Sequence, residues 1–68
     1  MNWSTLKEQW LQIKGQVRKQ WGKLSDGEID QIQGDAEILL GKLQRHYGYA
    51  REQAEEELER WQAERKAS

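Results

Sequence analysis

Closely spaced carboxylates are the residues of this sequence whose number and spacing come nearest to a catalytic or metal-binding set. Five glutamates crowd one short segment: Glu52, Glu55, Glu56, Glu57 and Glu59. Paired carboxylates act as general acid and base only when burial or a close charge moves their pKa values. A chain of 68 residues has too thin a core to desolvate such a run, so a solvated helix face explains it better. We therefore expect no catalytic residues and a protein that is not an enzyme.

The sequence offers equally few Ser, His or Cys residues that could act as a nucleophile, a base or a metal ligand. Nucleophilic catalysis needs an activated Ser or Cys beside a base and a third group that orients the base. The sequence has no Cys and a single His, His46, while Ser4 and Ser25 stand where helix caps are expected. A zinc ion held by one imidazole would need several carboxylates to complete its site, which is an uncommon arrangement. We expect no bound metal and no cofactor.

Basic residues near the N-terminus suggest a different chemistry, contact with phosphates. Residues 1–24 carry five Lys or Arg against one acid, a net charge of +4, and residues 25–68 sum to −5. A patch of this kind would neutralise a few backbone phosphates. The alternative is a basic helix whose charges are satisfied by acidic neighbouring helices, which the overall pI near 5.8 favours. The candidate nucleic-acid contacts are Lys14, Arg18, Lys19 and Lys23.

The four tryptophans could stack on bases, but their positions favour a hydrophobic core. Apolar residues from Leu6 to Leu24 recur at helical intervals and fall within an arc of about 80°. Trp10 and Trp21 lie on this stripe, and Trp61 ends a second stripe in the last segment. We expect these three indoles to be buried.

Capping signals set the boundaries of the first two segments. Thr5 and Glu8 have capping-box spacing, so one helix is predicted to begin near Ser4 or Thr5 and to continue to Leu24. Ser25 and Glu28 form a second capping box. Because Leu24 and Ile29 flank this cap at the spacing of a hydrophobic staple, the chain is expected to turn sharply there.

Residues 26–47 form either one long helix or two helices that meet at Gly34-Asp35. We favour the break, because Gly is a poor interior residue and Asp a good N-cap. Gly48 is the expected left-handed cap of this unit. A last helix follows, with residues after about 64 expected to fray. The predicted fold class is all-α, a small bundle of three to four helices in a single domain, residues 1–68.

Glycine positions raise the question of self-association. Gly15 and Gly22 share a face beside Leu11, and Gly34 and Gly41 share one with Ile38. If these faces are exposed, weak self-association follows; if not, the glycines mark helix ends and tight crossings within one molecule. No apolar run is long enough to span a membrane and the start lacks a signal-peptide pattern, so we expect a cytoplasmic protein.

The chain carries four short motifs: Trp21-Gly22-Lys23-Leu24, Ile32-x-Gly34, Leu40-Gly41-Lys42 and Tyr47-Gly48-Tyr49. Together they resemble the CsbD-like family, most closely its enterobacterial YjbJ-type members. The resemblance extends from about Asn2 to Trp61. It implies a small helical domain, similar to two orthogonally packed helical hairpins of the SAM-like kind, produced in bacteria under general stress. It implies no catalytic or binding residues.

The predicted function is therefore a non-catalytic stress-response role. High charge, 34% of all residues, and a mean hydropathy of −1.15 suggest a protective hydrophilic protein. The alternative is a nucleic-acid-binding module that uses the basic first helix. The sequence assigns no specific partner.

Overall fold

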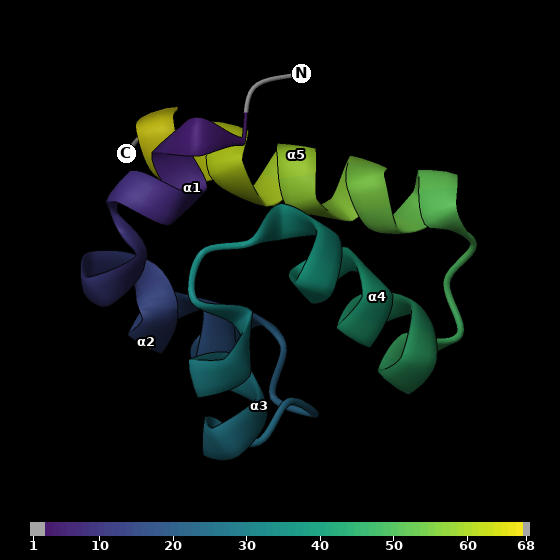
Figure 1. The fold of residues 1–68 in the computed structure, drawn as a ribbon. Helices are drawn as coiled ribbons and strands as arrows, with labels where there is room; N and C mark the ends of the chain where they lie inside the picture. The colour runs from purple at the N-terminus through teal and green to yellow at the C-terminus, as the bar shows by residue number, and fades with distance from the viewer. Residues whose placement is uncertain (1–2, 68) are drawn as a thin grey trace.

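The computed structural model describes residues 3–67, and the side chains of residues 3–65, as five helices joined by short connections (Figure 1). No strand occurs within these residues, so the predicted all-α class is confirmed. The helix count exceeds the predicted three to four because the first predicted helix is divided. The helices are α1 (Ser4–Glu8), α2 (Trp10–Gln20), α3 (Asp26–Ile32), α4 (Ala36–Tyr47) and α5 (Arg51–Ala67).

The prediction of one continuous N-terminal helix is wrong in two respects. The chain leaves helical geometry at Gln9, with φ −105° and ψ 13°, and α2 already ends at Gln20. The Thr5–Glu8 capping box does not form, because Trp3 is the N-cap of α1 and no side chain caps it. The bend at Gln9 allows α1 to pack on the turn at Gly34, a contact between distant segments that helical periodicity does not reveal.

The second capping box is confirmed. The backbone N–H of Glu28 donates to Ser25 Oγ over 3.2 Å, and the backbone N–H of Ser25 donates to Glu28 Oε1 over 3.2 Å. Leu24 and Ile29 are both buried, as expected of the staple that flanks the cap. This local signal therefore fixes where α3 begins.

The predicted break between α3 and α4 is also confirmed. Gln33 and Gly34 both take positive φ, 48° and 79°, which ends α3. Asp35 then caps α4, its Oδ1 accepting the N–H of Glu37 over 2.9 Å. Gly48, with φ 71°, is the left-handed cap of α4, as expected.

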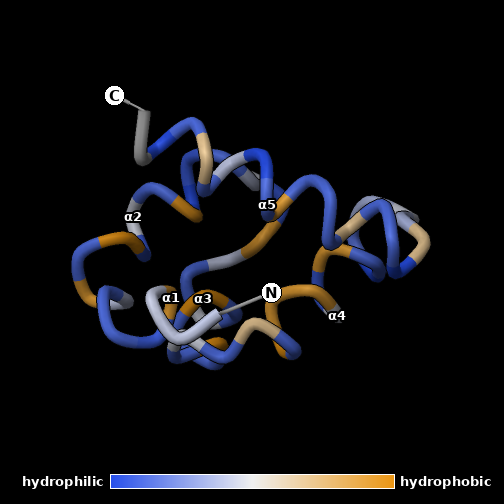
Figure 2. Tube along the Cα trace, turned by 90° about the horizontal axis from the view of Figure 1, so that it is seen from above, coloured by the Kyte–Doolittle hydropathy of each residue, from blue (hydrophilic) through white to orange (hydrophobic). Residues whose placement is uncertain are grey.

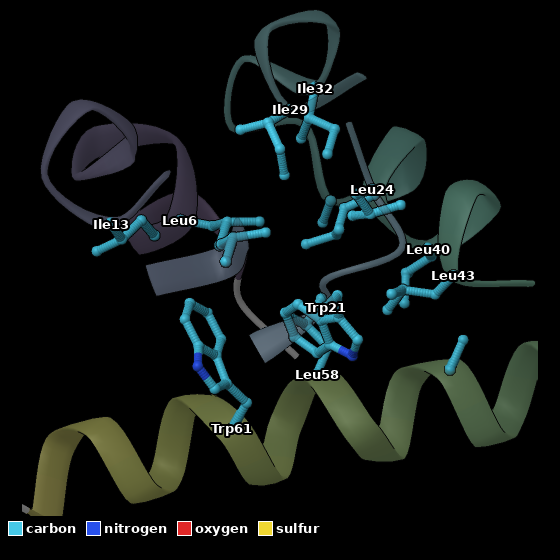
Figure 3. Packing of buried hydrophobic residues seen from close by; sticks show 14 of the residues in the cluster. Leu6, Ile13, Trp21, Leu24, Ile29, Ile32, Leu40, Leu43, Leu58 and Trp61 are labelled. Atoms are coloured by element: carbon cyan, nitrogen blue, oxygen red, sulfur yellow. The ribbon is translucent and has the colours of Figure 1, made fainter. Parts of the chain in front are cut away.

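A core of fifteen apolar residues joins all five helices. Figure 2 shows short hydrophobic stretches separated by hydrophilic ones along the chain. α5 runs along one side with α4 beneath it (Figure 1). Trp21 and Trp61 meet between α5 and the remaining helices, with ring centroids 5.3 Å apart (Figure 3). The core consists of Leu6, Trp10, Ile13, Val17, Trp21, Leu24, Ile29, Ile32, Ala36, Leu39, Leu40, Leu43, Ala54, Leu58 and Trp61.

The last helix continues to Ala67. The expected fraying after residue 64 stays a prediction, as does the SAM-like arrangement of the helices. Ser68 lies outside the described residues.

Candidate functional site

The outer side of α2 holds three of the four predicted nucleic-acid contacts. α2 directs Trp10, Ile13 and Val17 into the core. Its opposite side is consequently open to solvent, where Leu11 is 82% exposed. Arg18 and Lys19 are exposed and Lys14 is half-buried. Lys23 is also exposed, but it lies beyond the end of α2.

Two of these four cations are engaged by neighbouring residues. Arg18 forms an ion pair with Asp26, the first residue of α3. The Lys23 ammonium lies 4.9 Å from the centroid of the Tyr47 ring, a cation–π distance, and the Lys23 backbone N–H donates to Tyr47 Oη over 3.3 Å. Within residues 3–65, Lys14 and Lys19 have no ion-pair partner. The charge available to phosphates is thus smaller than the sequence suggested.

A groove of about 290 Å³ separates α2 from α3 beside these residues. Lys14 and Arg18 supply two positive charges on one side, and Asp26 and Asp30 two negative charges on the other. Because the charges balance, the groove favours no anion. The remaining lining residues are Gly15 and Ile29.

Three of the four tryptophans are too deeply buried to stack on bases. Trp10, Trp21 and Trp61 are 7%, 3% and 8% exposed, which confirms that they belong to the core. Trp3 is partly buried against the same core. A stacked pair of tyrosines that sequence reasoning did not identify lies at the end of α4, where the Tyr47 and Tyr49 centroids are 5.5 Å apart.

An ionic cluster between α3 and α4 also escaped the sequence analysis. His46 Nε2 lies 2.6 Å from Glu28 Oε2, and Lys42 Nζ lies 3.8 Å from the same oxygen. The contact with His46, followed by the Ser25 N–H, lowers the pKa of Glu28 from 4.5 to about 2. Glu28 thus serves both as capping residue and as a link to α4. No local sequence pattern predicts the contact between Glu28 and His46, because the two residues lie on different helices.

The acidic run of α5 divides into paired and unpaired members. Arg51 holds Glu37 of α4 through two hydrogen bonds of 2.8 and 2.7 Å, and Glu55 through one of 3.1 Å. These contacts raise the pKa of Arg51 and lower that of Glu37. Arg60 pairs with Glu57. Three exposed carboxylates, at Glu52, Glu56 and Glu59, have no ion pair within residues 3–65.

Other kinds of site find no support in this part of the chain. Residues 3–65 contain no group of three His, Cys, Asp or Glu side chains close enough to hold a metal ion. Among the same described residues, no helix has the length and apolar character needed to cross a bilayer.

Comparison with known proteins decides the classification. Residues 5–56 match the family described as CsbD-like. The chain belongs to this CsbD-like family. It is 47% identical over 53 residues to the UPF0337 protein YjbJ of Escherichia coli O6:H1, an alignment that covers 78% of this chain and 77% of YjbJ.

Further bacterial relatives extend the match. The UPF0337 protein pc0632 of Protochlamydia amoebophila is 49% identical over 57 residues, 84% of this chain and 86% of the relative. The UPF0337 protein ECA0631 of Pectobacterium atrosepticum is 40% identical over 62 residues, 91% of this chain and 90% of the relative. No solved structure matches the chain. These matches agree with the resemblance to the CsbD-like family seen in the motifs.

Proposed function

We propose that this CsbD-like chain is a non-catalytic, cytoplasmic stress-response protein that protects other macromolecules as an abundant hydrophilic protein. The observation that carries the proposal is the distribution of side chains. Charged residues make up 34% of the sequence, and none of those in residues 3–65 is buried, and every buried side chain in this part of the chain is apolar. A small rigid core thus presents a dense shell of charges to water.

Weak and unselective contact is the mode of action that such a surface supports. Exposed ion pairs each contribute little, about 0–1 kcal/mol, and salt screens them. A net charge of −1 provides no long-range attraction to a particular partner. Leu11 and Ile38 are the exposed large hydrophobic residues of the described part, and they lie on different helices. We infer that protection comes from keeping unfolding molecules apart, which requires protein in amounts comparable with its clients.

The test is protection of a client enzyme during drying or heating. Residual activity and light scattering are measured as the ratio of this protein to client rises from substoichiometric to an excess. We expect protection to begin near equal amounts and to exceed that of an inert globular protein at equal mass. Protection no better than the inert protein would contradict the proposal. Protection at a small fraction of the client concentration would indicate a specific chaperone instead.

Nucleic-acid binding is the second candidate, favoured only by the unpaired Lys14 and Lys19 on α2. Binding through three phosphates would weaken about tenfold or more between 50 and 200 mM salt. We expect no submicromolar binding of DNA or RNA, because Asp26 and Asp30 of α3 lie beside the patch and repel phosphates. Salt-sensitive submicromolar binding that disappears in the triple variant Lys14→Glu, Arg18→Glu, Lys19→Glu would make this candidate the better one.

A further inference from the structure

Two helix faces of opposite charge lie at the surface of this structure, and among their charged residues only Arg18 has an ion-pair partner within residues 3–65, Asp26 of α3. We name the first the basic face, on the outer side of α2: Leu11, Lys14, Gly15, Arg18 and Lys19. We name the second the acidic stripe, on the outer side of α5: Glu52, Glu56 and Glu59. All of these residues are exposed except Lys14, which is half-buried.

The basic face has the shape of a shallow helix-docking surface. Leu11 is 82% exposed, and a Cβ added at Gly15, one turn further along, would meet no atom within 4 Å. The missing side chain leaves backbone open between Lys14 on one flank and Lys19 on the other. Glycine at such a position lets a helix of another molecule approach closely. The ammonium groups of Lys14 and Lys19 then reach past the axis of that helix.

The acidic stripe has matching dimensions. Glu52, Glu56 and Glu59 lie opposite the buried Ala54 and Leu58 and therefore point away from the molecule's own core. The unpaired Lys14 and Lys19 are five residues apart on α2, a rise of about 7.5 Å, and Glu52 and Glu56 are four residues apart on α5, a rise of about 6 Å. The two faces can therefore align charge against charge along parallel or antiparallel helices.

We propose that the basic face of one molecule docks on the acidic stripe of a second copy of this chain, giving weak head-to-tail self-association. Charge complementarity argues for this occupant, since residues 1–24 carry +4 and residues 25–68 carry −5. The two faces differ, so a docked pair still offers one free basic face and one free acidic stripe. Association of this kind extends beyond a dimer unless rotation closes a ring.

The contact is weak, because its ion pairs are exposed and its apolar part is a single leucine. It therefore operates at the high concentration that an abundant protein reaches and is strongest at low salt. Self-association goes beyond the protective role proposed above, and either proposal can be wrong while the other is correct. Protection of a client can persist without self-association, and self-association can occur without protection.

The experiment follows amide NMR shifts and sedimentation of the full chain from about 50 μM to a few millimolar, at low and high salt. We expect concentration-dependent shifts confined to α2 and α5. The concentration at half-maximal change should rise about fivefold when salt is raised from about 50 to 300 mM. Shifts that do not depend on concentration, or that map to α3 and α4, would overturn the proposal.

Charge reversal with a mixing step gives the sharper test. The variants Lys14→Glu/Lys19→Glu and Glu52→Lys/Glu56→Lys should each lose the concentration dependence, and their mixture should restore it. Lys7→Glu/Arg45→Glu and Glu8→Lys/Glu64→Lys provide controls of equal charge at exposed positions away from the two faces. Because the controls keep both faces, each should retain the concentration dependence by itself; if the controls lose it as the face variants do, net charge and not the proposed faces drives the contact, and the proposal fails.

Gly15→Gln separates association from folding. The added side chain meets nothing within the molecule and suits a helix better than Gly, so stability should rise. Because it fills the open strip between Lys14 and Lys19, self-association should fall several-fold. Unchanged association in this stabilised variant would contradict close helix docking. Binding of an RNA oligonucleotide with submicromolar affinity at α2 would replace the second copy with a nucleic acid as the occupant.

Discussion

Replacing Gly by Ala should lower the stability of the fold at Gly34 and raise it at Gly41, seven residues further along the chain. Gly41 lies inside α4, and a Cβ added there would meet no atom within 4 Å. Replacing an interior helical Gly by Ala stabilises by about 1 kcal/mol when nothing clashes. For a domain of this size, that gain raises Tm by about 4–8 °C. We therefore expect Gly41→Ala to be stabilised by this amount.

Gly34 combines two obstacles to a side chain. Its φ of +79° is left-handed, which costs an L residue about 1–2 kcal/mol. The added Cβ would lie 2.6 Å from the Cα of Lys7, a backbone atom that can move only if α1 shifts. Together these effects should cost a few kcal/mol, a large part of the stability of a small domain. Gly34→Ala should therefore melt at least about 10 °C below the wild type.

Gly48→Ala is the matched control that isolates backbone strain. Gly48 has a φ of +71° but no atom within 4 Å of an added Cβ, so it should lose only about 1–2 kcal/mol. The difference between Gly34→Ala and Gly48→Ala then measures the packing of α1 on the turn. Urea and thermal unfolding followed by far-UV circular dichroism give all three values. Equal losses of stability in Gly34→Ala and Gly48→Ala would refute the packing of α1 on the turn. A destabilised Gly41→Ala would refute the open surface of α4 at this position.

Three further perturbations test the core, the ionic cluster and a helix cap. Trp21→Ala removes a 3% exposed indole that contacts Trp61 and should cost about 3–5 kcal/mol, so an unchanged Tm would show that Trp21 is not a core residue. Since the folded-state pKa of Glu28 is lowered to about 2 from 4.5, its ionised form stabilises the fold above pH 4.5, and this contribution is lost as pH falls through about 2. Glu28→Gln should flatten urea stability over that range, and parallel curves would argue against the link to His46. Asp35→Ala should lose about 1 kcal/mol by removing the cap of α4, a loss that Asp35→Asn should largely avoid.

The limits of sequence reasoning are clearest at the beginning of α1 and among the four candidate nucleic-acid contacts. Thr5 and Glu8 have the same spacing as Ser25 and Glu28, yet only the second pair forms a capping box. At the first pair the N-cap is Trp3, two residues before Thr5, and Trp3 packs against the core. Arg18 and Lys23 were grouped with Lys14 and Lys19, although Asp26 and Tyr47 engage them across turns of the chain. Which charges remain free depends on distant neighbours, and that information is not local.

The sequence by itself determined the helical class, the apolar stripe of each helix and the breaks at Ser25, Gly34 and Gly48. These features depend on periodicity, on capping hydrogen bonds between residues two or three apart, and on the φ preference of glycine, all of which act over a few residues. Only the tertiary structure decided the bend at Gln9, the pairing of Glu28 with His46, and which glycine is crowded and which is open. Those features depend on contacts between segments that the chain brings together when the core closes, so no short window of residues contains their cause.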